Sequence, residues 1–197
     1  MTPDEVLSLF RECSALLDGH FRLSSGLHSS GYLQCALVLQ HPAHATALGR
    51  TLAGRVTALR PDVVLSPALG GVIIGHEVAR ALGVRALFAE REGTALTLRR
   101  GFRLSAGERV VVVEDVITTG GSTLETMEVA RAAGGVVVAA TAIVNRSAGR
   151  AALGVPLHAL VDLVLPTYQP EACPQCASGV ALTKPGSRPV APGGPSA

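Results

Sequence analysis

The chain has 197 residues, of which 48% are hydrophobic and 16% charged. That much apolar material must bury a core, so the composition excludes a disordered protein, and the length is that of one domain. A net charge of +2 and an aromatic share of 3% disfavour a protein that coats nucleic acid through a basic surface or stacks bases on aromatic rings. The longest apolar run, residues 136–144, is shorter than a membrane span, and the N-terminus lacks a secretory pattern, so we expect a cytoplasmic protein.

The first third of the chain is predicted to hold two helices separated by a loop and a strand. Thr2, Pro3 and Glu5 form a capping-box pattern, and helical spacing of apolar residues extends that helix to about residues 18–19. Residues 20–31 are rich in Ser and Gly and predict a polar loop, followed by a strand over residues 32–39. A second helix is expected over residues 43–59.

From residue 61 onward, predicted strands and helices alternate along the chain. This alternation predicts the fold class α/β, with a doubly wound, mostly parallel central sheet. We expect a single domain over residues 1–185 and a flexible tail, rich in Pro and Gly, over residues 186–197. The expected strands are 62–66, 84–89, 109–113, 136–144 and 158–165, and the expected helices are 72–82 and 122–133, with a polar stretch over 90–104.

Two adjacent acids, Glu114 and Asp115, follow four valines and precede a Thr/Gly loop, residues 116–122. Ligands of parallel sheets bind beyond the carboxyl ends of the strands. There, two carboxylates can accept hydrogen bonds from ribose hydroxyls, while loop N–H groups at a helix start bind phosphate. The motif therefore predicts a ribose 5-phosphate site. The alternative is that Ser122 and Glu125 only cap a helix after an ordinary turn.

The loop lacks the glycine and lysine spacing of P-loop ATPases and the glycine spacing of dinucleotide-binding folds. Instead, the strand, acid pair and loop resemble the signature with which type I phosphoribosyltransferases bind 5-phosphoribosyl 1-diphosphate. Four more segments are similar, in the same order, to the orotate phosphoribosyltransferase family: residues 19–29, 66–71, 88–102 and 143–146. The likeness covers roughly residues 4–165 and continues to residues 184–187.

This resemblance implies a type I phosphoribosyltransferase fold with a small hood formed by about residues 1–40 and 158–180. The implied reaction joins orotate to 5-phosphoribosyl 1-diphosphate, giving orotidine 5′-phosphate and diphosphate in pyrimidine biosynthesis. It also implies a homodimer and Mg²⁺ that arrives with the substrate, without a dedicated protein cage. We expect small-molecule substrates and neither nucleic acid nor membrane as partners.

The resemblance also implies roles for individual residues. Arg146 matches the residue that pairs with the orotate carboxylate, a task suited to a two-pronged guanidinium. The catalytic candidates are Asp115, Glu114, Arg91, Arg99 and Arg100. The implied ligands of the ribosyl diphosphate are Glu114, Asp115, Val116, Ile117, Thr118, Thr119, Gly120, Gly121, Ser122, Leu69, Gly70 and Arg91. The implied ligands of orotate are Thr118, Arg146, Ser24, Ser25, Gly26 and Tyr32.

One departure from the family concerns cations. The family usually carries several lysines around the diphosphate, whereas the single lysine here is Lys184, near the C-terminus. Residues 93–96 stand where related chains often have a lysine on a mobile loop. The nearby cations are Arg91, which matches a cation of the family, and Arg99, Arg100 and Arg103. We expect the last three to form an anion lid, because they lie between Arg91 and the acid pair; the alternative is a solvated loop.

Two other functions stay open at this point. A purine-base phosphoribosyltransferase would share the ribose-phosphate loop but should lack both the loop at residues 24–29 and Arg146. A non-catalytic regulator could use the same fold to sense the ribosyl diphosphate.

The cysteines and histidines predict no complete metal site. Cys173 and Cys176 have the spacing of half a zinc knuckle, but zinc usually takes four ligands, and Cys13 and Cys35 are predicted in a helix and a strand. The six histidines are not spaced as a cluster, and none is assigned to catalysis. The sequence therefore disfavours zinc unless two copies of the chain share a site.

Overall fold

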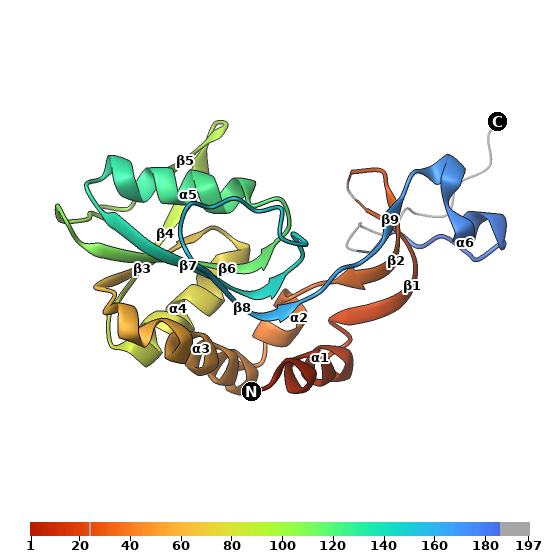
Figure 1. Cartoon of the computed structure of the whole chain (residues 1–197), viewed down its shortest axis with the longest axis horizontal. Coiled ribbons are helices and arrows are strands. Elements are labelled where there is room, and N and C mark those ends of the chain that lie inside the picture. The colour runs from red at the N-terminus through yellow and green to blue at the C-terminus, as the bar shows by residue number, and fades with distance from the viewer. Residues whose placement is uncertain (24, 186–197) are drawn as a thin grey trace, which may run out of the picture. The chain divides into compact units, whose positions relative to one another are not determined.

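The computed structural model describes residues 1–23 and 25–185 and divides the chain into two units (Figure 1). The larger unit consists of residues 1–15 and 34–164, and the smaller contains residues 16–33 and the segment from residue 165 onward. The expected hood of residues 1–40 and 158–180 overlaps the smaller unit at residues 16–33 and from residue 165 onward, whereas residues 1–15, 34–40 and 158–164 belong to the larger unit. The expected tail, residues 186–197, lies outside the described residues.

A six-stranded sheet forms the centre of the larger unit, with strand order β5-β4-β3-β6-β7-β8. All neighbouring pairs are parallel except β4 and β5, which confirms the doubly wound, mostly parallel sheet. The strand β5 was not expected, because it lies in the polar stretch at residues 90–104. The strands are β3 Val63–Pro67, β4 Arg85–Glu92, β5 Ala95–Leu98, β6 Arg109–Ile117, β7 Val136–Asn145 and β8 Leu157–Asp162.

Helices cover both faces of this sheet: α5 lies on one face, and α3 and α4 lie on the other (Figure 1). The sequence of β6 fits this arrangement. Its consecutive valines, Val110 to Val113, are fully buried, as expected for a strand that helices cover on both faces. On the side of α5, Met127 and Ala130 pack on strand residues such as Val112. The helices of this unit are α1 Pro3–Glu12, α2 Ala36–Leu39, α3 Pro42–Val56, α4 Gly70–Leu82 and α5 Gly121–Ala132, with a 3-10 turn at Thr57–Leu59.

The N-terminal region differs from the prediction. The capping box of Thr2 and Glu5 is present, but α1 ends at Glu12, and Ser14 adopts a positive φ of 53° that takes the backbone out of the helix. Residues expected at the end of that helix instead open a strand, and the predicted strand at residues 32–39 gives way to a helix from residue 36. The expected polar loop at residues 20–31 is mostly a β-hairpin.

The smaller unit is a three-stranded sheet in the order β1-β2-β9, formed by Leu16–Arg22, His28–Leu33 and Thr167–Tyr168. All of its strand pairs are antiparallel. After β9 come a 3-10 turn at Pro170–Ala172 and the short helix α6, Pro174–Ala177. Thr183 then pairs with Phe21 of β1, so the C-terminal segment borders both edges of the hairpin. Within the described parts of both units, no helix is long and apolar enough to cross a membrane.

Candidate functional site

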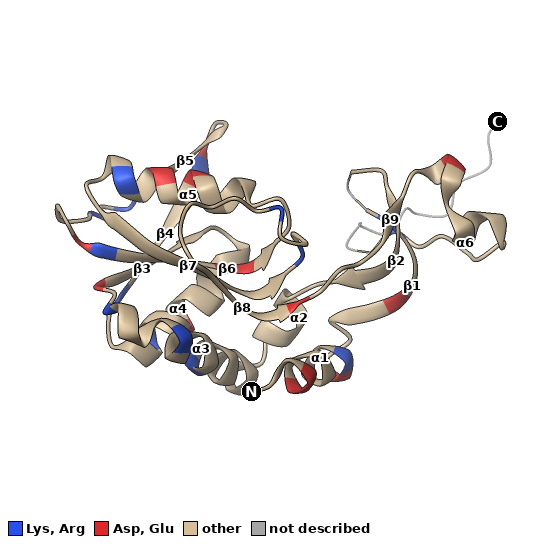
Figure 2. Ribbon diagram, in the orientation of Figure 1, with Lys and Arg blue, Asp and Glu red and all other residues tan. Residues whose placement is uncertain are grey.

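The loops that follow β3 and β6 meet at a point where the strand order reverses. From β3 the chain passes through α4 to β4 on one side, whereas from β6 it passes through α5 to β7 on the other side. Crevices for ligands open at such switch points, at the carboxyl ends of the strands. The ribbon of β6 is coloured for acidic residues near this end (Figure 2). The fold therefore places the predicted acid pair and glycine loop at the same site.

Gly70 and Asp115 bring these two loops into direct contact. A Cβ atom at Gly70 would lie 2.8 Å from Asp115 Oδ1 and 3.0 Å from Oδ2, which is closer than Cβ atoms approach other atoms. Gly71 is equally confined, because its Cβ would lie 2.8 Å from the carbonyl oxygen of Val113. Two consecutive glycines therefore let the start of α4 pack against the end of β6. The Ala68–Leu69 peptide bond just before them is cis, and Leu69 is exposed.

The two acids differ in their surroundings. Glu114 is 5% exposed and accepts a 2.6 Å hydrogen bond from Ser122 Oγ. The pKa of Glu114 is raised to about 7, mainly by burial; the hydrogen bond from Ser122 opposes this rise, and the charge of Asp115 adds to it. Asp115 accepts a 2.8 Å hydrogen bond from the N–H of Val116, and burial raises its pKa as well. Burial therefore shifts both acids toward their protonated forms, and a cation or hydroxyl-bearing ligand that binds here would favour their ionised forms.

The phosphate-loop candidates Thr118 and Thr119 are exposed between β6 and α5. Gly120 has a φ of 86°, and α5 begins at Gly121 with no side chain capping its N-terminus. The alternative that Ser122 and Glu125 form a capping box is therefore wrong. The start of α5 keeps backbone N–H groups and the partial positive charge of the helix, which suit a phosphate. Val116 and Ile117, also predicted ligands, are the last residues of β6.

Arg146 follows β7, and its N–H donates a 2.7 Å hydrogen bond to the carbonyl of Ile117. Its Nε atom is buried and has no hydrogen-bond partner among the described residues. Burial lowers the pKa of its guanidinium. A planar donor held without an acceptor is suited to an anionic ligand such as a carboxylate.

Two of the predicted cations, Arg91 on β4 and Arg100 just after β5, are paired with carboxylates. Arg91 forms a 2.6 Å ion pair with Glu125 of α5. Arg100 donates two 2.7 Å hydrogen bonds to Glu90 and lies over the ring of Phe88. Sequence reasoning missed both acidic partners, because nothing in the spacing links them. Arg99 is exposed and makes no ion pair within the described part of the chain.

The remaining predicted orotate ligands belong to the smaller unit. Ser24 lies outside the described residues. Ser25 and Gly26 lie in the turn between β1 and β2, which is closed by a 2.8 Å hydrogen bond from Leu23 N–H to the carbonyl of Leu27. The ring of Tyr32, on β2, lies 5.8 Å from that of Phe21. The role of these residues toward orotate stays a prediction.

Comparison with known proteins places the chain in a family. Residues 36–153 match the family described as the phosphoribosyl transferase domain. A curated orotate phosphoribosyltransferase from Pelotomaculum thermopropionicum is 54% identical over 190 residues, covering 96% of this chain and 100% of that protein. The chain belongs to the orotate phosphoribosyltransferase family. The resemblance stated from the sequence is thereby confirmed for the family and for the fold.

Solved structures of this family agree. The orotate phosphoribosyltransferase of Aeropyrum pernix superposes with a TM-score of 0.69 at 31% identity, covering 80% of this chain and 93% of that one. The Mycobacterium tuberculosis orotate phosphoribosyltransferase in complex with 5-phospho-α-D-ribosyl 1-diphosphate gives a TM-score of 0.63 at 25% identity, covering 81% of this chain and 94% of that one. A member of the same family thus binds the ribosyl diphosphate that the sequence predicts here.

Proposed function

We propose that this protein transfers the 5-phosphoribosyl group from 5-phosphoribosyl 1-diphosphate to N1 of orotate, forming orotidine 5′-phosphate and diphosphate in pyrimidine biosynthesis. Curated relatives that are 50–54% identical over nearly the whole chain are named orotate phosphoribosyltransferase. The observation that carries the proposal is the packing of Gly70 against the Asp115 carboxylate. It brings together, at the carboxyl ends of β3 and β6, the groups that suit a ribose, a 5-phosphate and a diphosphate.

Phosphoribosyl transfer needs electrostatic positioning more than a protein nucleophile. As the bond from C1 of the ribose to diphosphate breaks, positive charge develops on the sugar and negative charge on the leaving group. The carboxylates of Glu114 and Asp115 accept hydrogen bonds from the ribose hydroxyls and stabilise the developing positive charge. The loop at residues 118–122 holds the 5-phosphate, so the reacting carbon is fixed relative to orotate N1.

Orotate carries a carboxylate that needs a cationic partner. Arg146, whose buried Nε has no hydrogen-bond partner among the described residues, would supply the paired donors. Thr118 lies at the end of β6, whose last residue, Ile117, accepts the hydrogen bond from the Arg146 backbone. These two residues would orient the base.

Magnesium is proposed as the cofactor, carried by the diphosphate substrate. The available donors fit this ion, because Glu114 and Asp115 offer the carboxylate oxygens that Mg²⁺ prefers. When bound, Mg²⁺ would offset the charge of the leaving diphosphate. In place of the missing lysine, Arg99 and Arg100 would add positive charge there. Arg100 must first leave Glu90, and Arg91 must leave Glu125 before it can reach the diphosphate.

A homodimer and a cytoplasmic location complete the proposal. The dimer is supported by the family resemblance, in which the mobile loop of one subunit reaches the site of the other. A reducing compartment is supported by the four cysteines, none of which forms a disulfide in the structure. Sedimentation at several protein concentrations, compared with specific activity at the same dilutions, tests whether the dimer is the active form.

The test of the activity is the loss of orotate absorbance in the presence of the ribosyl diphosphate and Mg²⁺. Adenine, hypoxanthine and uracil are assayed in parallel, and Asp115→Asn is the matched variant with an almost unchanged side-chain shape. We expect consumption of orotate alone, with a large loss of rate in the variant. Turnover of a purine instead would favour the purine-base enzyme. Binding of the ribosyl diphosphate without turnover of any base would favour the sensor.

A further inference from the structure

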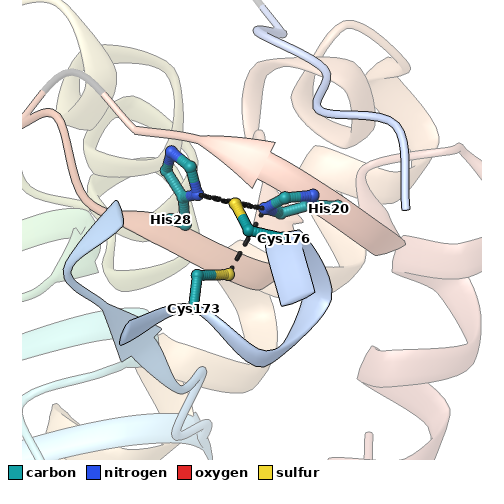
Figure 3. A group of neighbouring side chains, drawn as sticks. All are labelled: His20, His28, Cys173 and Cys176. Carbon is teal, nitrogen blue, oxygen red and sulfur yellow. Dashed lines mark hydrogen bonds between the residues drawn. The ribbon is translucent and has the colours of Figure 1, made fainter. Parts of the chain in front are cut away.

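Four side chains of the smaller unit converge on one point (Figure 3). His20 comes from β1, His28 from the start of β2, and Cys173 and Cys176 flank the start of α6. One nitrogen of each histidine and both sulfurs lie within 4.8 Å of one another. In the described part of the chain, no other group of three or more His, Cys, Asp or Glu side chains converges in this way.

The separations are close to those around a tetrahedral zinc ion: two of the four fall in the expected range, and two are about 0.1–0.3 Å shorter. Zinc bonds of about 2.3 Å to sulfur and about 2.0–2.1 Å to nitrogen place neighbouring ligand atoms roughly 3.3–3.8 Å apart. Here His20 Nε2 lies 3.4 Å from Cys173 Sγ, 3.6 Å from Cys176 Sγ and 3.0 Å from His28 Nδ1. Cys176 Sγ lies 3.2 Å from His28 Nδ1. The four atoms therefore need to move only slightly to enclose the ion.

Hydrogen bonding alone does not explain this convergence. His20 Nδ1 lies 2.8 Å from the carbonyl oxygen of Val180, which can only accept, so Nδ1 carries the proton and Nε2 presents its lone pair. One lone pair on Nε2 accepts one good hydrogen bond, yet three polar atoms surround it. A cation satisfies all four atoms at once. The contact with the Val180 carbonyl is also the kind of outer hydrogen bond that orients metal-binding histidines.

We propose that His20, His28, Cys173 and Cys176 of one chain form a structural zinc site. Two thiolates with two imidazoles are a ligand set that favours zinc, and four protein ligands leave no open position for a reacting molecule. His20, His28 and Cys173 are buried, whereas Cys176 is exposed and marks the side from which an ion enters. The site lies outside the residues assigned to phosphoribosyl transfer.

The smaller unit has a physical need for such a cross-link. Among its described residues, Leu16, Phe21 and Cys173 are the buried hydrophobic side chains. Units with so small a core generally require a metal, disulfides or assembly to fold stably. A zinc ion bound by the hairpin and by the knuckle at residues 173–176 would fasten the C-terminal segment to β1 and β2.

Metal analysis of the full-length protein, purified without chelators, tests the proposal. We expect about one zinc per chain, the stoichiometry of a closed four-ligand site. Replacement by Co²⁺ should give the intense visible absorption of a tetrahedral ion together with a thiolate charge-transfer band. Cys173→Ser and Cys176→Ser should each lower the zinc content at least tenfold. Cys13→Ser is the matched control, because Cys13 Sγ also adjoins a histidine, at 3.6 Å from His44 Nδ1, but belongs to no cluster.

The proposal also has outcomes that overturn it. Zinc retained by the Cys173→Ser/Cys176→Ser double variant would place the metal elsewhere. One zinc per two chains would indicate a site shared between copies. Two titratable thiols per denatured chain, where four are expected, would indicate a disulfide between Cys173 and Cys176. The cobalt spectrum and the thiol count use the unmodified protein, so they decide the matter even if the variants do not fold.

Discussion

Replacing Gly70 by alanine isolates the contact that joins the two substrate loops. The new Cβ would lie 2.8 Å from Asp115 Oδ1, so the carboxylate must retreat by about 0.6 Å to reach the 3.4 Å at which ordinary contact begins. Gly70 has no positive φ, so alanine fits its backbone. The nearest atoms are the end of a side chain that can move. We therefore expect the variant to fold and the position of the carboxylate to change.

The magnitude follows from what the carboxylate does. A shift of this size would weaken its hydrogen bond from the Val116 N–H and the one to a ribose hydroxyl. A hydrogen bond to a charged group contributes about 1.5–3 kcal/mol, and each 1.4 kcal/mol is about tenfold in affinity. We expect kcat/KM for the ribosyl diphosphate to fall roughly 10- to 100-fold, measured by orotate consumption at limiting ribosyl diphosphate.

Gly54→Ala is the matched control for this experiment. Gly54 is an exposed residue inside α3, and a Cβ there meets no atom within 4 Å. This change should leave kcat/KM unaltered and raise the free energy of unfolding by about 0.5–1 kcal/mol. Full activity of Gly70→Ala, or an equal loss in both variants, would refute the assignment of the Gly70–Asp115 contact to substrate binding.

Three further predictions concern charged residues. Arg146→Lys should raise the KM for orotate roughly 10- to 100-fold, because the paired donors are lost, and should hardly change the KM for the ribosyl diphosphate. Arg131→Lys on α5 is the control. Equal rises in the KM values of the two substrates would contradict a role in binding the orotate carboxylate. Burial keeps the pKa of Glu114 at about 7 against 4.5 for a solvated carboxyl. The folded protein therefore binds the extra proton between these values, and the free energy of unfolding should fall by about 3 kcal/mol as pH rises through that window. Urea titrations of the protein and of Glu114→Gln measure this, and an identical pH slope in both would contradict it. Arg99→Ala should lower kcat about tenfold, a larger loss than that of Arg100→Ala, because Arg100 is already paired with the carboxylate of Glu90. A larger loss of initial rate in Arg100→Ala would count against Arg99 as the cation that binds the diphosphate.

Most of the central sheet could be predicted because its strands are buried on both faces. Four consecutive valines, Val110 to Val113, are typical of a strand covered on both faces, and two acids directly after such a strand indicate a ligand site. The strand nevertheless continues to Ile117, because polar residues at a sheet's functional end keep their ladder hydrogen bonds. The run of apolar residues alone predicts that this strand ends at residue 113.

The errors in the prediction concern features that the periodicity of apolar residues does not indicate. Leu16 and Leu17 continue the helical spacing of α1, but the positive φ of Ser14 turns the chain before it reaches them. His20 and His28 look unrelated to Cys173 in the sequence, since 153 residues separate His20 from that cysteine. Their meeting depends on the pairing of the hairpin and on the return of the chain at β9, which only the fold supplies.

The smaller unit is built from two segments that lie far apart in the sequence, so it cannot fold completely until the second segment has been synthesised. The β1–β2 hairpin is synthesised early, yet its edges are covered by Thr167–Tyr168 and by Thr183, and His20 meets the carbonyl of Val180 across 160 residues. Until those late residues leave the ribosome, both edges of the nascent hairpin are open to pairing with other chains. Closure of this unit is therefore a late step of folding, and a chain released before Thr183 would leave the outer edge of β1 open to pairing with other chains.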